Sequence, residues 1–120
     1  MKILSSLFIG LLLFNLQCNT TKPAEVKTQL LSIKEQVRQG AMLVDVRTPE
    51  EFAEGSIDGA VNIPLDQVER RVDEFRGKPS VVVFCKTGNR SGQAIKILEE
   101  NGIHNVTNGI NVPQMKEALK

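Results

Sequence analysis

Apolar residues after position 28 alternate between two spacings along the chain. Short runs of apolar and β-branched residues predict four strands, at 41–46, 60–63, 80–84 and 104–107. Apolar residues three and four positions apart predict helices at 28–38, 65–75, 91–100 and 112–119. Strands that alternate with helices pair in parallel through right-handed crossovers. The pattern therefore predicts a small α/β domain with a mostly parallel central sheet and helices on both faces.

One more helix is predicted to begin at residue 49. Thr48 is a good cap, and Pro49 suits the first helical turn. Glu50 and Glu51 follow at the positive end of the helix dipole, where acidic side chains are stabilising. The segment from Gly55 to Gly59 then reads as a turn.

The first 17 residues follow neither spacing. Lys2 precedes an apolar run over 3–16, and no other charged residue occurs before Lys22. The run is shorter than the roughly 20 residues that span a bilayer, and it is apolar on every side. This pattern is typical of a secretory signal peptide, which we expect over residues 1–17.

Cys18 directly follows this run, and its position resembles the lipobox of bacterial lipoproteins, in which that cysteine is acylated. Gln17 stands where such boxes usually carry a small residue. We expect cleavage before Cys18, a flexible tether over 18–28, and a folded domain over 29–120. The protein would then be exported to the periplasm or cell envelope and anchored by lipid to a bacterial membrane. An uncleaved amino-terminal anchor is the alternative.

The composition narrows the possible partners. The 120 residues leave room for one domain, and 15 Lys and Arg residues against 14 Asp and Glu residues give a net charge of +1. This charge, together with the absence of Trp and Tyr, argues against a nucleic-acid partner. One His and two Cys cannot form a zinc cluster, and we expect neither a metal nor an organic cofactor.

The strongest candidate for chemistry is Cys85, which follows the apolar run at 80–84. Ligands of open parallel sheets bind beyond the carboxyl ends of the strands. A turn before a helix can direct several backbone N–H groups inward, and Lys86 and Arg90 add positive charge nearby. Such surroundings favour a thiolate. The alternative is an inert buried cysteine. A cysteine that only fills the core, however, does not require a glycine-containing turn with two cationic side chains beside it.

Three ordered motifs together resemble those of rhodanese-type sulfurtransferases. The first is Cys85-x-x-Gly88-x-Arg90-Ser91, which resembles the family's active-site loop. The other two are the segments 44–52 and 55–64. The resemblance runs from about residue 30 to residue 120. It departs from the family pattern at Asn108-Gly109, where many members have Gly-Gly followed by a Trp, so the closing helix is expected to pack differently.

The resemblance implies a chemistry and a role for each loop residue. Cys85 would take a sulfane sulfur from an anionic donor such as thiosulfate and pass it, as a persulfide, to cyanide or a thiol. Lys86 and Arg90 would hold the donor, and the loop amides would stabilise the persulfide. Asp45 and Arg47 would support the loop without reacting. The candidate loop residues are Lys86, Thr87, Gly88, Asn89, Arg90 and Ser91.

Two other functions remain open from the sequence. A rhodanese-like module could dock a partner without catalysis. Phosphatases and arsenate reductases that resemble rhodaneses use a Cys-x5-Arg loop, whereas Cys85 and Arg90 are separated by four residues. The shorter loop suits a sulfur atom, and it contains no Asp or His to act as a general acid.

Overall fold

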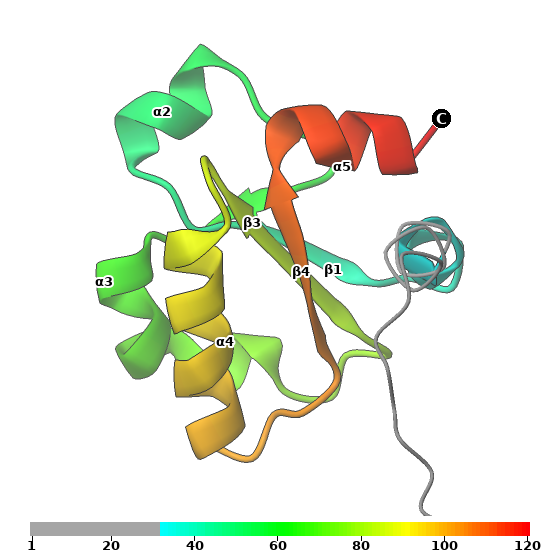
Figure 1. Ribbon diagram of the computed structural model, residues 1–120. Helices are drawn as coiled ribbons and strands as arrows, with labels where there is room; N and C mark the ends of the chain where they lie inside the picture. The colour runs from blue at the N-terminus through cyan, green and yellow to red at the C-terminus, as the bar shows by residue number, and fades with distance from the viewer. Residues whose placement is uncertain (1–31) are drawn as a thin grey trace, which may run out of the picture.

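The computed structural model describes residues 32–120, which form a parallel sheet flanked by helices (Figure 1). The strands are β1 (Met42–Asp45), β2 (Val61–Asn62), β3 (Val81–Cys85) and β4 (Val106–Asn111). They lie in the order β2-β1-β3-β4, and every neighbouring pair is parallel. The predicted α/β fold with a parallel sheet is therefore confirmed.

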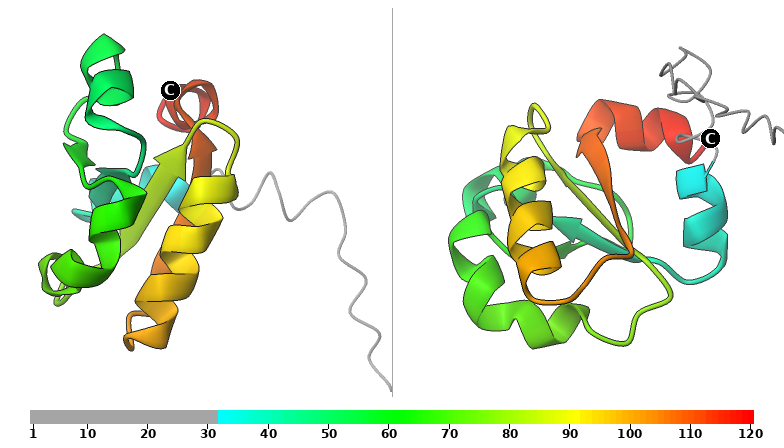
Figure 2. Two further views of the ribbon diagram at one scale, coloured as in Figure 1. Left: turned by 90° about the vertical axis from the view of Figure 1, so that its left-hand side faces the viewer. Right: turned by 60° about the horizontal axis from the view of Figure 1, so that its bottom comes forward.

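Helices cover both faces of this sheet (Figure 2). They comprise residues 32–38, α2 (Pro49–Glu54), α3 (Leu65–Val68), the 3-10 helix η1 (Glu69–Phe75), α4 (Asn89–Glu100) and α5 (Val112–Ala118). On one face, α3, η1 and α4 pack through Val68, Phe75 and Leu98. On the other face, the helix at 32–38 and α5 pack through Ile33 and Met115.

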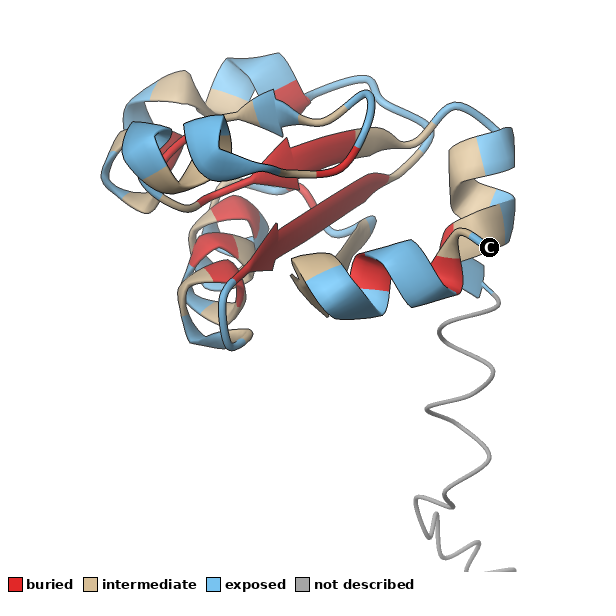
Figure 3. Cartoon of the chain, turned by 90° about the horizontal axis from the view of Figure 1, so that it is seen from above, coloured by how far each residue is buried: buried red, intermediate tan, exposed pale blue. Residues whose placement is uncertain are grey.

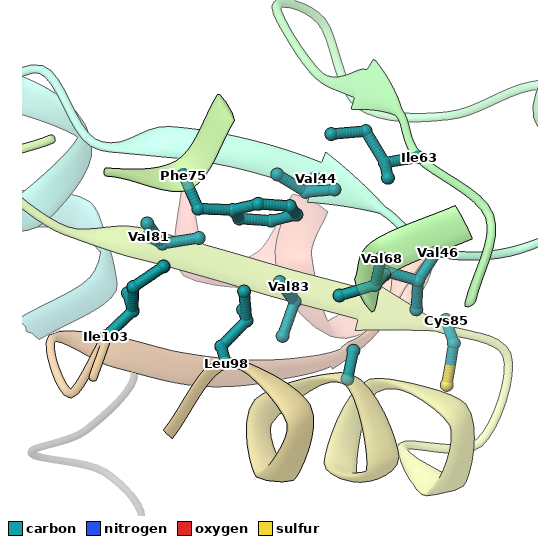
Figure 4. Packing of buried hydrophobic residues seen from close by; sticks show 11 residues of the cluster. Val44, Val46, Ile63, Val68, Phe75, Val81, Val83, Cys85, Leu98 and Ile103 are labelled. Atoms are coloured by element: carbon teal, nitrogen blue, oxygen red, sulfur yellow. The ribbon is translucent and has the colours of Figure 1, made fainter. Parts of the chain in front are cut away.

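The central strand β3 supplies apolar side chains to both layers of the core. Val81 and Val83 face α3 and α4, whereas Val82 and Phe84 face α5, as the two-residue period of a strand requires. All five residues of β3 are buried, which explains the continuous apolar run in the sequence. Figure 3 shows this burial along the strands, and Figure 4 shows the layer that contains Val81 and Val83.

The structure differs from the predicted helices in type over 65–75 and in the starting residue of α4. The segment at 65–75 is not one regular helix, because α3 ends at Val68 and the chain continues as η1, with Arg71 outside the helical region at φ −111° and ψ 19°. Short helices often tighten to 3-10 winding at their ends. Helix α4 begins at Asn89 instead of Ser91, after Gly88 in a left-handed conformation at φ 93°.

The start of α2 is as predicted and fixes the position of Glu51. The Thr48 hydroxyl accepts a hydrogen bond from the Glu51 amide at 3.2 Å, and the Glu51 carboxylate accepts one from the Thr48 amide at 3.3 Å. This reciprocal cap uses one oxygen of Glu51 and fixes the direction of its carboxylate.

The strand β4 contains an irregularity that lets α5 pack closely. Val83 pairs with Asn108 and Phe84 pairs with Ile110, so Gly109 is an extra residue in the ladder. Buried Met115 of α5 occupies the space beside it, and a Cβ added to Gly109 would overlap the Met115 sulfur. In this chain the closing helix therefore packs through a methionine onto a glycine.

None of the helices within residues 32–120 has the length and apolar character needed to cross a membrane. The predicted signal peptide, Cys18 and the tether lie outside the described residues.

We expect the Gly109→Ala substitution to destabilise the domain by about 1–3 kcal/mol, because the new methyl group overpacks a closed core. Urea unfolding followed by circular dichroism measures this change. The matched control is Gly92→Ala in α4, where the nearest atom to the new methyl group is 3.9 Å away. That control should gain about 0.5–1 kcal/mol from its better helix propensity. Equal stability of the two variants would contradict the packing argument.

Candidate active site

Cys85 is the last residue of β3, at the carboxyl edge of the sheet. The strand extends one residue further than the sequence predicted, so the thiol is held by the strand itself and not by the loop. Its residue is only 1% exposed and belongs to the core layer beside α4. Figure 4 shows its sulfur directed toward the start of that helix.

Two hydrogen-bonding groups of the following segment reach the sulfur. The Gly88 backbone N–H donates to Cys85 Sγ at 3.1 Å, and the Ser91 hydroxyl oxygen lies 3.3 Å from the same sulfur. The left-handed backbone conformation of Gly88 turns its amide inward, and residues other than glycine rarely adopt this conformation. The loop therefore directs donors at a sulfur that is otherwise surrounded by apolar groups.

These contacts oppose the effect of burial on the thiol. Burial raises the pKa of Cys85. The Ser91 hydroxyl and the backbone N–H groups of Ser91, Thr87 and Gly88 lower it by more, so the pKa lies below its ordinary value. The environment therefore favours the thiolate, which is the nucleophilic form of cysteine.

Arg90 is paired with a side chain that the sequence did not suggest. Its Nη1 and Nη2 atoms donate to the two carboxylate oxygens of Glu51 at 2.7 and 3.0 Å. These bonds raise the pKa of Arg90, and negative charge on Cys85 and Asp45 acts in the same direction. The guanidinium thus lies within the electrostatic reach of the thiolate while α2 fixes its orientation.

Asp45 and Arg47 form a second ion pair at the end of β1. The buried Asp45 carboxylate accepts from Arg47 Nη2 at 2.7 Å and from the Ser56 hydroxyl at 2.8 Å. Arg47 also donates to the Gly55 carbonyl at 2.7 Å. The pair ties the strand end to the turn that precedes β2. Asn62 completes the link by donating to the carbonyls of Asp45 and Arg47. The sequence predicted that Asp45 and Arg47 support the Cys85 loop, and that role stays a prediction.

The remaining candidate residues lie on the outside of the loop. Lys86, Thr87 and Asn89 are exposed. The Thr87 hydroxyl accepts from the Asn89 amide at 3.4 Å, and the Asn89 side chain accepts from Gln93 at 2.9 Å. The structure therefore brings Cys85, Gly88 and Ser91 together around the sulfur and places these three side chains away from it.

Sequence reasoning missed the partners that come from other elements. Glu51 was noted only for its place at a helix start, and no role was given to Ser56 or Asn108. The Asn108 side chain accepts a hydrogen bond from Ser91 at 2.8 Å and donates to the Gly88 carbonyl at 3.1 Å. These contacts join residues that are 17 and 20 positions apart, and no local pattern of residues signals them.

Within residues 32–120, no three His, Cys, Asp or Glu side chains are grouped so that they could hold a metal ion.

A model of the rhodanese-like domain matches residues 24–111. The chain belongs to this family. The matched range includes the loop that begins at Cys85, whose sequence resembles the rhodanese active-site motif.

Several bacterial proteins are similar to this chain over most of the domain. The Bacillus subtilis protein YqhL is 42% identical over 78 residues, which are 62% of this chain and 62% of YqhL. A sulfurtransferase of Allochromatium vinosum is 34% identical over 84 residues, which are 70% of this chain and 78% of that protein. The thiosulfate sulfurtransferase PspE of Escherichia coli is 40% identical over 67 residues, 54% of this chain and 64% of PspE. The chain thus spans just under two thirds of YqhL and PspE.

Solved structures show the same rhodanese fold. A rhodanese from Escherichia coli with bound anions has a TM-score of 0.58 and 35% identity, covering 62% of this chain and 91% of that one. The human single-domain sulfurtransferase TSTD1 has a TM-score of 0.51 and 27% identity, covering 77% and 88%. The family model and these structures agree on a rhodanese-like domain, and two of the named relatives are sulfurtransferases.

The Glu51–Arg90 pair gives the domain a pH dependence that can be measured. Arg90 lowers the pKa of Glu51 from 4.5 to about 2. A carboxylate with a lowered folded pKa stabilises fully above its unfolded pKa, and this contribution is lost as the pH falls through the folded value. We expect Glu51→Gln to lower the free energy of unfolding by up to about 1 kcal/mol at pH 7, because the pair is partly exposed. The difference from the parent chain should vanish between about pH 5 and pH 2.

Glutamine at position 51 can still cap α2, so the substitution isolates the ion pair. The matched control is Glu50→Gln on the same helix, which is exposed and should change stability little. Urea unfolding across this pH range checks the prediction, and a Glu51→Gln effect that is constant from pH 7 to pH 2 would contradict it.

Proposed function

We propose that the protein is a rhodanese-type sulfurtransferase that carries a sulfane sulfur as a persulfide on Cys85. The observation that carries this proposal is the convergence of the Gly88 amide and the Ser91 hydroxyl on a single buried sulfur. Such a site stabilises negative charge on sulfur, which both the thiolate and the persulfide bear.

The proposed reaction has two steps, and the enzyme alternates between two forms. The Cys85 thiolate attacks the outer sulfur of thiosulfate, the sulfur–sulfur bond of the donor breaks, and sulfite leaves with the bonding electron pair. Cyanide or a thiolate then attacks the outer sulfur of the persulfide. The bond to Cys85 breaks, the thiolate is regenerated, and thiocyanate or a new persulfide leaves. No metal or organic cofactor is needed.

Charge and space at the site suit a small anionic donor. Lys86 is exposed at the first position of the loop, and only two of the five N–H groups of Arg90 donate to Glu51. Both cations are therefore proposed to attract the donor. Because Cys85 is almost fully buried, a slender donor atom such as a terminal sulfur reaches it best. The similarity to the thiosulfate sulfurtransferase PspE supports the same donor class.

We expect the full-length chain to gain the mass of one sulfur atom when it is incubated with thiosulfate, and to form thiocyanate when cyanide is added. Cys85→Ser should do neither, because it lacks the nucleophile. The matched control is Cys18→Ser, which removes the other cysteine of the chain and should leave both results unchanged.

Intact-mass spectrometry and a thiocyanate assay measure these outcomes. Failure of the parent chain to gain sulfur from any sulfane donor would refute the proposal. Turnover of an aryl phosphate or of arsenate would instead support the phosphatase or arsenate reductase alternative. A Cys85 thiol that titrates at its free value, without turnover, would support a binding module.

We also propose that the protein is exported and held at a bacterial membrane by a lipid on Cys18. The single charge at Lys2, the apolar run over 3–16 and the position of Cys18 support this placement. One acyl-chain anchor binds a membrane weakly, so stable attachment requires more than one chain.

For the chain expressed with its amino terminus in a bacterium, we expect the membrane fraction to contain a form without residues 1–17 and with lipid on Cys18. Intact mass after detergent extraction identifies this form. Cys18→Ala should abolish the lipid mass. Full-length protein that retains residues 1–17 in the membrane would show an uncleaved anchor instead.

A further inference from the structure

One side chain of β4 binds two of the residues that contact the Cys85 sulfur, Gly88 and Ser91. Asn108 Oδ1 accepts a hydrogen bond from the Ser91 hydroxyl at 2.8 Å, and Asn108 Nδ2 donates to the Gly88 carbonyl at 3.1 Å. Ser91 and Gly88 are the residues whose hydroxyl and amide reach Sγ. Asn108 therefore binds the Ser91 hydroxyl directly and the Gly88 residue through its carbonyl, and so acts on the surroundings of the sulfur from the side of β4.

The Ser91 hydroxyl has one proton and two neighbours that can accept it. Asn108 Oδ1 is 2.8 Å from the hydroxyl oxygen, and Cys85 Sγ is 3.3 Å from it. A hydroxyl donates a single hydrogen bond, so it serves either the amide oxygen or the sulfur at one time. Ser91 is fully buried, so its partners come from the protein and not from bulk water.

Each protonation state of Cys85 selects one of these arrangements. A neutral thiol donates its S–H to the Ser91 oxygen, while Ser91 donates to Asn108. When the thiol proton passes to water, the thiolate can only accept, and the Ser91 hydroxyl turns its proton from Asn108 to the sulfur. The Asn108 oxygen then keeps the Ile110 N–H, which donates to it at 2.9 Å. Asn108 thus competes with the thiolate for one proton.

The backbone around Asn108 supports this role independently. Ile110 has φ 72°, the one non-glycine residue within 32–120 with a positive φ. A β-branched residue is strained there, and such strain persists only where the surrounding structure imposes it. The N–H of Ile110 is held by Asn108, and its side chain lies against Gly88, where an added Cβ would be 3.3 Å from it. The strained turn therefore fixes the Asn108 oxygen opposite Ser91.

We propose that Asn108 is a positioning residue that controls the ionisation of Cys85 through the single hydroxyl proton of Ser91. This inference rests on the proposed role of Cys85 as the nucleophile. It assigns a function to the position at which the chain departs from the Gly-Gly pattern of many rhodaneses.

One charged side chain among the described residues interacts electrostatically with the sulfur, and it is Arg90 of α4. Glu51 of α2 and Asp45 of β1 act through their interactions with Arg90, whereas Lys86 is exposed on the outside of the loop. The strand β4 contains no charged residue. Any influence of β4 on the thiol is therefore exerted through hydrogen bonds. Substitutions in β4 can test this influence without removing any of the charged side chains around the sulfur.

The test is the pH dependence of Cys85 alkylation by iodoacetamide in the full-length chain carrying Cys18→Ser. Asn108→Ala and Asn108→Asp both lose the hydrogen bond to the Gly88 carbonyl and differ in the acceptor they offer to Ser91. Asn108→Ala frees the Ser91 hydroxyl for the sulfur. The pH midpoint of Cys85 alkylation should therefore fall, and the alkylation rate at pH values below that midpoint should rise about tenfold. Asn108→Asp holds the hydroxyl more strongly and adds negative charge, so the midpoint should rise.

Ser91→Ala separates this mechanism from a merely structural role. In that background, Asn108→Ala should not shift the midpoint, and Asn108→Asp should shift it less than when Ser91 is present. A midpoint that rises in Asn108→Ala, as a loosened loop would cause, overturns the inference. Equal shifts with and without Ser91 also overturn it. If Asn108→Ala does not fold, as judged by circular dichroism, the two Asn108→Asp shifts decide.

Alkylation requires no sulfur transfer, so the two proposals fail separately. A chain that shows the predicted shifts but never gains sulfur from a donor would retain this inference and lose the proposed function.

Discussion

The site depends on a balance at one sulfur atom. Removing Cys85 from water disfavours its charged form. The hydroxyl of Ser91 and the backbone N–H groups of Ser91, Thr87 and Gly88 together outweigh that effect and lower the pKa. Because these donors come from a glycine turn and from the first turn of α4, the balance requires the loop to keep one conformation. Much of the surrounding structure serves that requirement.

Two elements brace the loop from different directions, and an ion pair holds the end of the strand beside it. From α2, Glu51 holds Arg90 through two hydrogen bonds, and its own position is fixed by the Thr48 cap. The strand β4 contributes Asn108, which binds the loop at Gly88 and Ser91. The Asp45–Arg47 pair holds the end of the adjacent strand β1. Parallel strands make this possible, because their carboxyl ends meet at one edge of the sheet.

The sequence predicted those features that depend on neighbouring residues. The buried run at 81–84 identified β3, because both faces of that strand are covered, and the Thr48 cap identified α2. Cys85, Gly88 and Ser91 were found because they stand together in one motif. Glu51, Ser56 and Asn108 were not found as partners, because folding alone brings them to Arg90, Asp45 and Ser91. The change to 3-10 winding at Glu69 likewise carried no local signal.

The short edge strand β2 has a consequence for the behaviour of the molecule in solution. It contributes only Val61 and Asn62 to the ladder. The Asn62 side chain donates hydrogen bonds to the carbonyls of Asp45 and Arg47. An exposed sheet edge can recruit a strand from another molecule and start aggregation. Here that side of the sheet offers two residues, which is too short a template for intermolecular β-sheet growth.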